Sequence, residues 1–457
     1  MKKILLFCLF PFFLTADTEA IKTTAEDSEQ VLSMPQDVNF ERVWRKRYVF
    51  DNEIDFPKGI SFLSFAHYSA KVESFPAAMC IKDKSGADIV KINAPEDVEP
   101  PYTMHLSLCG KSKPTVFVTK NGKTKFSSQA VYPKGFNPTD KAHINSLTVE
   151  GEGGIANVVS SLSAGVGQAD VRFVTRGRQN ELYLEGTKAY FTFSARFYAS
   201  ILAVGSIDLA NLSSGVALEG YILFDYGDGQ LRNDLACHLF YDDVSCEWRA
   251  WTSNFSTAFD KTGKKGISGR IEGGINAAWS LESPLHGISI MQAKSLGLKG
   301  MNEDPCGTWD DDAKKWRLFV SAFTPKGIRA QMLESEFWDR DFKPITETVP
   351  VDSTGTTIAF MNGKRYGIFG SSDRAYYVYS YPELTKLGAL KLTPEPWNNK
   401  KGWPHGRGWP AFVELPDNMP YRYLLLTFDR TNFPTIPKPN WTYGELSIYA
   451  GVLQNPQ

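Results

Sequence analysis

The sequence predicts an all-β protein in which a five-bladed β-propeller follows a small N-terminal β-sandwich-like domain. The main observation is a strand plan that recurs five times between residue 181 and the C-terminus of the 457-residue chain. Repeats of roughly fifty residues are typical of propeller blades, whose twisted sheets bury one another's faces when they stack around an axis. The second observation is that no helical periodicity is sustained along the chain, which argues against a (β/α)8 barrel.

Each repeat has a first strand, a turn, a second strand opened by an aromatic residue, and a third strand. The first strand pairs read ELYLEGTKAYFTFSAR from Glu181, DLACHLFYDDVSCEWRAWTSN from Asp234, DPCGTWDDDAKKWRLFVSAF from Asp304, TTIAFMNGKRYGIFGSSD from Thr356 and AFVELPDNMPYRYLLLTFDR from Ala411. Large aromatic side chains dominate the interfaces between sheets. We therefore expect the aromatic residues that open the second strands to pack between blades: Tyr190, Trp248, Trp316, Tyr366 and Tyr423.

The N-terminal region has the pattern of an exported protein. Lys2 and Lys3 precede the apolar run ILLFCLFPFFL, and small residues follow at Ala16 and Ala20. This pattern predicts a secretory signal peptide over residues 1–20, and hence a periplasmic or extracellular protein with no membrane span once the signal is removed. The expected order is then a flexible leader over residues 21–38, an N-terminal β-rich domain over residues 39–140 and the propeller over residues 141–457.

The charge of the chain bears on its binding partners, and its cysteines bear on possible disulfide bonds. The chain has 50 basic and 51 acidic residues and a formal net charge of −1, which argues against a nucleic acid partner. Cys8 falls within the signal, and export to an oxidising compartment leaves two pairings open, as disulfides or as buried thiols. These pairings are Cys237 with Cys246 and Cys80 with Cys109, with Cys306 left over. The oligomeric state is left open.

Carboxylates at the starts of three repeats are the strongest functional signal. The innermost strands of a propeller run beside its axis, so their first residues converge at one mouth of the central channel. The first three repeats start with Glu181, Asp234 and the Glu303-Asp304 step, whereas the fourth and fifth start without a carboxylate. Such carboxylates can divide the work of a general acid and a base or nucleophile, as glycoside hydrolysis requires. These four residues are the predicted catalytic residues.

Other polar and aromatic residues are expected to line the same mouth. Arginine forks match carboxylate and sulfate groups, which leaves open an acidic sugar as substrate, and tryptophan faces suit stacking on sugars. His405 is also a candidate acid, since the pKa of an unperturbed histidine is near neutral. The substrate-binding candidates are Arg178, Arg232, Asn233, Asn302, Asp373, Arg374, His405, Arg407, Trp309 and Trp409. For each candidate and for each carboxylate, a purely structural role is the alternative.

No metal and no organic cofactor is predicted. No two histidines lie three to five residues apart with a third ligand type nearby, so the spacing indicates no metal site. The sequence leaves open a structural calcium ion in the central channel, but no spacing of ligand residues requires one.

The repeats resemble those of the five-bladed β-propeller glycoside hydrolases, the group that contains families 32, 43, 62, 68, 117 and 130. The resemblance rests on MNEDPCGTWDDDAKKWRLFVSAF and LRNDLACHLFYDDVSCEWRAWTSN and covers residues 180–457. It implies a base or nucleophile on the first blade, an orienting carboxylate on the second and a general acid on the third. These roles fall on Glu181, on Asp234 and on Glu303 or Asp304. The family pattern most often has Asp on the first blade and Glu on the third, so the assignment of acid and base stays open.

The function predicted from the sequence is therefore hydrolysis of glycosidic bonds in a poly- or oligosaccharide by an exported enzyme. Two alternatives remain. A propeller polysaccharide lyase would cleave beside a uronic acid with His or Tyr as base, although such lyases have seven blades. A glycan-binding protein would bind without turnover, since a propeller fold alone proves no function. The sugar, the linkage and the stereochemical outcome cannot be read from the sequence.

Overall fold

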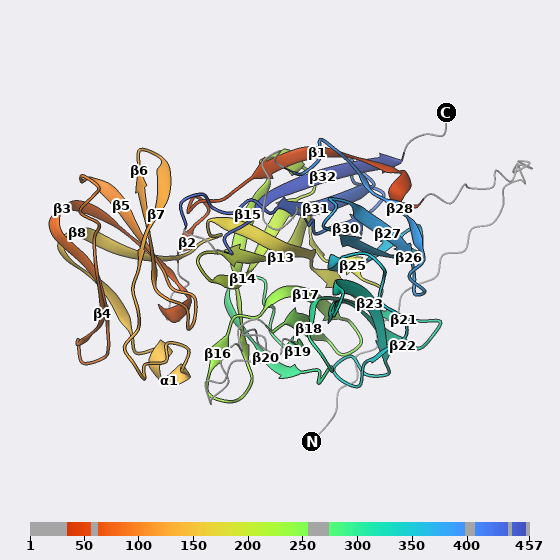
Figure 1. Ribbon diagram of the computed structural model, residues 1–457, viewed down its shortest axis with the longest axis horizontal. Coiled ribbons are helices and arrows are strands. Elements are labelled where there is room, and N and C mark those ends of the chain that lie inside the picture. The colour runs from red at the N-terminus through yellow and green to blue at the C-terminus, as the bar shows by residue number, and fades with distance from the viewer. Residues whose placement is uncertain (1–33, 56–62, 255–273, 398–406, 437–440, 454–457) are drawn as a thin grey trace, which may run out of the picture. The chain divides into compact units, whose positions relative to one another are not determined.

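The structure is a computed structural model that describes residues 34–55, 63–254, 274–397, 407–436 and 441–453. The regular structure of these residues is almost entirely β-strand, as Figure 1 shows. The exceptions within the described ranges are the short helix α1 (Lys141–Ile144) and three 3-10 turns: η1 (Pro35–Asp37), η2 (Leu63–Phe65) and η3 (Leu212–Ser214). The all-β prediction is confirmed. Within the same ranges, no helix is long and apolar enough to cross a membrane.

Five four-stranded antiparallel units, called blades I to V here, make up most of the chain. Blade I contains β9 (Gly167–Phe173), β13 (Lys188–Arg196), β14 (Ser200–Asp208) and β15 (Val216–Asp225); blade II contains β17 (Leu235–Asp242), β18 (Glu247–Ser253), β19 (Ile275–Ser280) and β20 (Gly287–Ser295); blade III contains β21 (Asn302–Asp310), β22 (Lys315–Thr324), β23 (Gly327–Ser335) and β24 (Lys343–Pro344); blade IV contains β25 (Thr354–Met361), β26 (Lys364–Gly370), β27 (Tyr376–Ser380) and β28 (Lys386–Ala389); blade V contains β30 (Ala411–Glu414), β31 (Tyr423–Asp429), β32 (Glu445–Leu453) and β1 (Val38–Lys46). The first strand of each blade contacts the first strand of the next, and β30 contacts β9. A closed ring of first strands of this kind defines a five-bladed β-propeller.

The N-terminal strand β1 completes blade V beside the C-terminal strand. β1 pairs antiparallel with β32 from Val38↔Leu453 to Lys46↔Leu446. The ring of Phe40 is fully buried and meets the ring of Phe412 edge to face, with the centroids 5.8 Å apart. Residues 39–46, which were expected to belong to the N-terminal β-rich domain, thus pair within blade V. Strands from both ends of the chain close the last blade.

Short strands border the blades: β10 (Thr175–Arg176), β11 (Glu181–Leu182), β12 (Leu184–Glu185), β16 (Leu231–Arg232) and β29 (Lys391–Thr393). Blades I and II also join at their outer edges, where β15 and β20 pair in parallel from Gly220↔Gly287 to Asp225↔Gln292. Glycine is required at Gly220, because a Cβ there would lie 2.3 Å from the carbonyl oxygen of Gly287. The pairing makes one continuous sheet of the two blades.

The first strand of blade I is β9, not the strand that the sequence placed at Glu181. All seven residues of β9 are buried, including the polar Gln168, Asp170 and Arg172. A strand buried on both faces is expected to be mainly apolar, so GQADVRF is hard to identify as one from its composition. The other four first strands, β17, β21, β25 and β30, begin close to the predicted starts.

The chain between β1 and β9 forms a separate seven-stranded sheet. Its strands are β2 (Ile54–Asp55), β3 (His67–Lys82), β4 (Asp88–Asn93), β5 (Tyr102–Ser107), β6 (Thr115–Lys120), β7 (Lys123–Gln129) and β8 (Thr148–Leu162). The long strand β3 pairs with β8 over most of its length and with β5 and β4 along its two halves. Strand pairing joins all seven strands into one sheet. Because β8 belongs to it, the sheet extends past the predicted boundary at residue 140.

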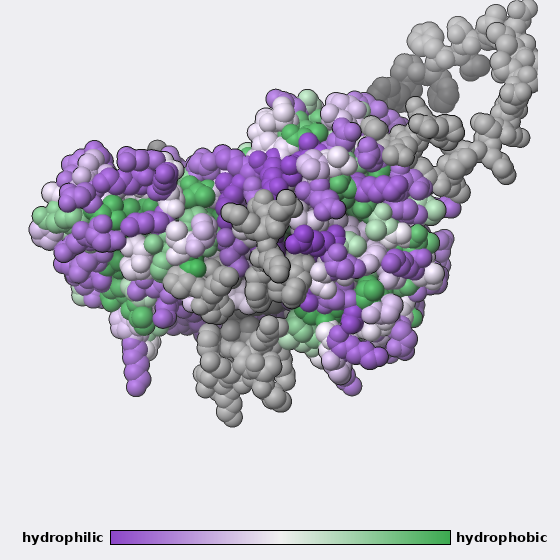
Figure 2. All heavy atoms as spheres, turned by 45° about the horizontal axis from the view of Figure 1, so that its top comes forward, coloured by the Kyte–Doolittle hydropathy of each residue, from purple (hydrophilic) through white to green (hydrophobic). Residues whose placement is uncertain are grey.

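The five aromatic residues that open the second strands are buried, which confirms their predicted place in the core. Their exposed fractions are 1% for Tyr190, 4% for Trp248, 4% for Trp316, 6% for Tyr366 and 0% for Tyr423. Figure 2 shows the complementary picture at the surface: hydrophilic residues dominate the face drawn, and hydrophobic residues occur on it in small groups.

The cysteines of the described residues are all free thiols. Cys237 is buried in β17 at the register break between Leu235↔Ser253 and His238↔Trp251, whereas Cys246 is exposed in the turn that follows the strand. Cys237 therefore lies near the start of the hairpin, and Cys246 lies in its turn. Neither of the two pairings left open by the sequence is formed.

The closing role of β1 can be tested with Phe40→Ala. We expect this change to lower the free energy of unfolding by about 3–5 kcal/mol, because it removes a fully buried ring from the core of blade V. Glu41→Ala, at the exposed neighbouring position, is the matched control and should change it by less than about 0.5 kcal/mol. Urea unfolding followed by tryptophan fluorescence measures both; equal midpoints for the two variants would contradict the pairing of β1 with β32.

Candidate functional site

The first strands of blades I to IV share a β-bulge at one position, where the strand ladder changes register. One residue in each bulge has a left-handed conformation: Asp170 (φ 57°), Ala236 (φ 51°), Asp304 (φ 62°) and Gly355 (φ 67°). Aspartate adopts this conformation more readily than most residues. Asp170 of blade I and Asp304 of blade III therefore occupy equivalent positions in the ring. Asp170 is thus a carboxylate on the first strand of blade I, where Glu181 was expected.

Asp170 and Asp304 receive the same contact from their own blades. Ser194 Oγ donates to Asp170 Oδ2 at 2.6 Å, and Ser321 Oγ donates to Asp304 Oδ2 at 3.2 Å. Each serine lies on the second strand of its blade, opposite the residue that precedes the aspartate. The same contact between an aspartate and a serine on the next strand thus occurs in blades I and III.

Arg196 brings a positive charge to Asp170. Its guanidinium forms an ion pair with Asp170 Oδ2, and the two residues are 6% and 4% exposed. Charge-assisted hydrogen bonds of this kind are stronger than neutral ones, and more so away from water. Both Ser194 and Arg196 contact Oδ2. The second oxygen, Oδ1, takes no part in these contacts.

Tyr443 links Arg196 to a second arginine across the junction of blades V and I. The Tyr443 hydroxyl accepts hydrogen bonds from Arg196 at 3.1 Å and from Arg430 at 3.5 Å. The guanidinium carbons lie 4.5 Å and 4.9 Å from the centre of its ring. Burial raises the pKa of Tyr443, the two arginines act in the opposite direction, and the charges of Asp170 and Glu303 add to the rise. Carboxylates of blades I and III therefore act on the same phenol.

Asp304 joins blade III to blade IV. Besides the bond from Ser321, its Oδ2 accepts hydrogen bonds from Thr354 Oγ1 at 2.7 Å and from the Gly355 N–H at 2.9 Å. Burial raises the pKa of Asp304, the bonds from Gly355 and Thr354 oppose this rise, and the nearby charge of Asp170 adds to it. Two nearby carboxylates thus have different environments, one bonded to an arginine and one to neutral donors.

Glu303 and Asp234 complete the carboxylates at this end of the ring. Glu303 is half-buried, whereas Asp170, Asp234 and Asp304 are buried. Asp234 Oδ2 accepts hydrogen bonds from the Tyr226 hydroxyl, from Thr252 Oγ1 at 3.0 Å and from Asn276 Nδ2 at 2.7 Å. Glu303 is the carboxylate of this group that solvent reaches most easily.

Most of the other residues predicted for this mouth bond to neighbouring protein groups. Arg232 pairs with Asp228, Asn233 donates to the Ser200 carbonyl, Asn302 donates to the Lys299 and Gly300 carbonyls, and Arg407 pairs with Asp352. Asp373 and Arg374 are exposed in the turn that follows β26, and Tyr377 donates to Asp373 at 2.5 Å. Arg374 is therefore the exposed cation among these candidates.

Glu181, Arg178 and Trp309 lie at the opposite end of the ring, so their predicted place beside Asp304 is wrong. Glu181 is exposed in β11 and pairs with Arg176, which follows the end of β9. The Trp309 N–H donates to the Arg178 carbonyl near the end of β21. Glu181 lines a cavity of about 470 Å³ there, together with Arg172, His238 and Cys306 among others.

Trp409 does not offer a face to a sugar, which corrects its assignment as a substrate-binding residue. It is 2% exposed, and a Cβ on Gly355 would lie 2.8 Å from its ring. Arg172 lies 5.3 Å from its ring centre. His405 lies outside the described residues.

Among the described residues, two groups of side chains are close enough together to hold a metal ion: Glu53 with His67 and His105, and Cys80 with Asp88 and Glu152. Both groups belong to the N-terminal sheet and its approach from β1, and neither includes a carboxylate of the ring.

Comparison with known proteins finds similarity to solved structures only. No family model and no curated protein matches the sequence. Solved structures that are similar include an endo-1,4-β-xylanase from Bacteroides thetaiotaomicron (12% identity, 62% of this chain and 90% of that chain, TM-score 0.38), a thermostable family-43 glycoside hydrolase (14% identity, 64% and 95%, TM-score 0.39) and inulosucrase from Halalkalicoccus jeotgali bound to kestose (13% identity, 63% and 85%, TM-score 0.44). The chain is thus similar to the five-bladed propeller glycoside hydrolases over about 62% of its length.

The pair of Asp170 and Arg196 can be tested with Arg196→Met. We expect this change to cost about 3–5 kcal/mol of unfolding free energy, because it leaves a buried carboxylate without its cation. Adding Asp170→Asn, which removes that charge and tolerates the left-handed backbone, should recover part of the loss. Arg176→Met is the control, since Arg176 pairs with Asp243 at the surface and should cost no more than about 1 kcal/mol. Additive losses in the Arg196/Asp170 double variant, measured by urea unfolding, would contradict the pair.

Proposed function

We propose that the chain is a glycoside hydrolase that acts on a poly- or oligosaccharide at the end of the ring where Asp170, Glu303 and Asp304 meet. The observation that carries this proposal is the set of carboxylates on blades I and III that Arg196 and Tyr443 connect. Hydrolysis of a glycosidic bond needs one carboxyl group that gives a proton and another that acts as base or nucleophile. Two carboxylates in contrasting environments are suited to this division.

Glu303 is the proposed general acid. It is the half-buried carboxylate of the group, so a glycosidic oxygen can approach it. Asp170 is the proposed base or nucleophile, because Arg196 and Ser194 hold Oδ2 and leave Oδ1 to meet a water molecule or the anomeric carbon. The first-blade role thereby moves from Glu181 to Asp170, and the pattern becomes Asp on the first blade and Glu on the third.

Asp304 and Asp234 are proposed as positioning residues. Asp304 fixes the bulge that follows Glu303 by accepting bonds from blade IV, and Asp234 is saturated with donors inside blade II. These bonds converge on Oδ2 of each aspartate and tie it to the neighbouring strands. Their part in the reaction is to hold the backbone that presents Glu303 and the neighbouring strand.

The proposed substrate carries an acidic group on its sugar. In the part of the chain that the structure describes, no carboxylate forms an ion pair with Arg430, although this arginine contacts Tyr443 beside the carboxylates. The exposed Arg374 follows the end of β26, which pairs with the start of β25 at this end of the ring. Arginine forks bind carboxylate or sulfate groups with two parallel hydrogen bonds. A uronic acid or a sulfated sugar meets this requirement.

A glycan-binding protein without turnover is the second candidate. The observation that favours it is the burial of Asp170, Asp234 and Asp304, which are 4%, 0% and 3% exposed and bond to protein donors. Binding without product release on a panel of neutral and acidic glycans would support this candidate.

Export is part of the proposal. It rests on the signal-like pattern of residues 1–20, which lie outside the described residues. An N-terminus at residue 17 or 21 in protein recovered from outside the cytoplasm supports export, and retention of Met1 contradicts it.

Substitution of Glu303 and of Glu181 tests which end of the ring carries the reaction. We expect Glu303→Gln to lower kcat on a natural glycan by about 10²–10⁴-fold, the usual contribution of a general acid. Glu181→Gln, at the opposite end, should leave kcat unchanged. The two rates are measured by reducing-sugar release, and thermal unfolding of both variants checks that each keeps its fold.

A second readout distinguishes proton donation from a structural role. A substrate whose leaving group is a nitrophenolate needs little help from an acid, so Glu303→Gln should lose far less activity on it than on the glycan. Equal losses on both substrates would remove Glu303 as the acid. A new ultraviolet absorbance in the products would instead indicate the lyase reaction.

A further inference from the structure

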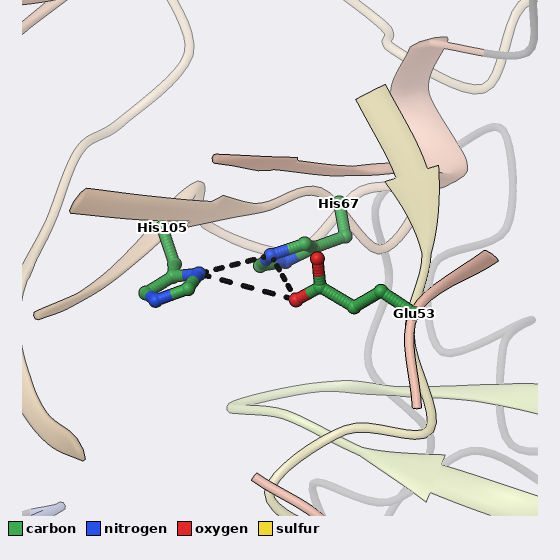
Figure 3. Close-up of side chains that lie close together, drawn as sticks. All are labelled: Glu53, His67 and His105. Carbon is green, nitrogen blue, oxygen red and sulfur yellow. Dashed lines mark hydrogen bonds and ion pairs between the residues drawn. The ribbon is translucent and has the colours of Figure 1, made fainter. Parts of the chain in front are cut away.

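Two histidines of the N-terminal sheet lie on the same face although they are far apart in sequence. In the antiparallel pair of β3 and β5, His67 lies opposite Ser107 and His105 lies opposite Ser69. The two histidines are therefore diagonal neighbours across the strands, which brings long side chains into contact. Figure 3 shows the two rings directed toward each other and toward Glu53.

Glu53 reaches these histidines from the segment that leads into β2. Ile54 of β2 pairs with Leu162 of β8, and the next residue along β8, Ser161, pairs with His67 of β3. This arrangement sets the carboxylate of Glu53 beside the histidines, as Figure 3 shows. Ser161 Oγ donates to the outer oxygen, Glu53 Oε2, at 3.2 Å.

The spacing of the three inner atoms suits a tetrahedral metal ion. Glu53 Oε1 lies 2.9 Å from His67 Nε2, His67 Nε2 lies 3.2 Å from His105 Nδ1, and His105 Nδ1 lies 4.0 Å from Glu53 Oε1. Ligands of a tetrahedral Zn²⁺ ion at the usual bond lengths are about 3.3–3.5 Å apart. The observed distances scatter around this value, so small side-chain adjustments would give three bonds.

Outer contacts hold the ligands in place. His67 and His105 are 0% and 6% exposed. His105 Nε2, the nitrogen away from the centre, lies 2.9 Å from Thr119 Oγ1. The ring of Phe50 stacks on both imidazoles, with centroids 4.6 Å and 4.4 Å away. Such second partners fix the orientation of metal-binding histidines.

The charge at this cluster also favours a cation. In the described residues, no lysine or arginine forms an ion pair with Glu53. The second cluster, Cys80 with Asp88 and Glu152, differs in this respect, because Lys91 and Lys82 lie 2.6 Å and 3.4 Å from Glu152. Ammonium groups already neutralise that carboxylate. A hydrogen on His67 Nε2 can point at only one of its two neighbours, whereas a cation at the centre attracts all three ligand atoms.

We propose that Glu53, His67 and His105 bind a divalent transition-metal ion of the Zn²⁺ class, with water as the fourth ligand. Imidazole nitrogens and a carboxylate oxygen form a donor set that Zn²⁺ takes in proteins. The ion ties the segment between β1 and β2 to strands β3 and β5. This site is independent of the proposed hydrolase reaction, since none of its ligands belongs to the ring. The spacing rule for histidines misses it, because its ligands come from three separate segments.

The test uses the full chain after removal of metals with a chelator. Titration with Zn²⁺ in a calorimeter should show one equivalent bound and an increase in Tm, because binding to the folded state stabilises it. Co²⁺ as a spectroscopic probe should give the visible absorption of a four-coordinate ion. His105→Ala should abolish both signals, whereas His286→Ala, at an exposed histidine just before β20, should retain them.

Glu53→Gln keeps the size of the side chain and guards against a variant that fails to fold. We expect its Zn²⁺ affinity to fall at least about tenfold, with circular dichroism unchanged. The proposal is overturned if the unmodified chain binds no Zn²⁺, or if the affinity and the Co²⁺ spectrum are the same in Glu53→Gln and in the unmodified chain. Stoichiometric binding that only the His286→Ala control loses overturns it as well.

Discussion

The pairing of β1 with β32 is the constraint on which the ring depends. Blade V would have three strands without β1, and the chain passes directly from β1 into the N-terminal sheet and from there into β9. Blades V and I therefore meet where the two ends of that inserted sheet leave the ring. The approach is close: a Cβ on Gly444 would lie 1.9 Å from the Gln168 carbonyl oxygen, and the Gln168 N–H donates to the Gly444 carbonyl at 3.4 Å. Glycine at this position allows the two blades to touch.

The candidate site is built on that junction. Tyr443 immediately precedes Gly444, and its hydroxyl accepts a hydrogen bond from Arg196 of blade I, which in turn pairs with Asp170. Closing the ring thus places a phenol and two arginines beside a carboxylate that lies two residues beyond the close contact. The contacts that close the ring therefore also bring the charged groups of the site together. Burial of the carboxylates makes each contact strong, and it also makes the site sensitive to the loss of any single partner.

The sequence predicted the architecture well because strand repeats and interblade aromatics are local patterns. Blades II to V start where those patterns placed them. Blade I does not, because β9 is a fully buried strand that contains Gln168, Asp170 and Arg172. The partners that satisfy these polar residues include Tyr48, Ser194 and Thr357, which lie in other segments of the chain. Because β9 could not be recognised, the sequence pattern placed the first strand of blade I at Glu181 and predicted Glu181 at the wrong end of the ring. Asp234, Glu303 and Asp304 were placed at the end of the ring where the structure has them, because each lies at the start of a recognisable strand.

Local sequence patterns could not predict contacts between segments that are distant in the chain. Arg196 and Tyr443 are 247 residues apart in the chain, yet share a hydrogen bond. His67 and His105 come together only because β3 and β5 pair in one particular register. Tryptophan is a typical sugar-stacking residue, but Trp409 is buried in the core. The missing side chain at Gly355 leaves room for its ring. A sequence shows which residues are able to do chemistry, and the register of the strands decides which of them meet.

The most direct test of the central claim is the fate of water in the reaction. An acidic glycan is incubated with the full chain in water enriched in oxygen-18, and the products are analysed by mass spectrometry. A hydrolase that works through Asp170 and Glu303 should place one heavy oxygen in the new reducing end, and Glu303→Gln should greatly slow its appearance. Unsaturated products without the label, or bound glycan that is recovered intact, would contradict the account.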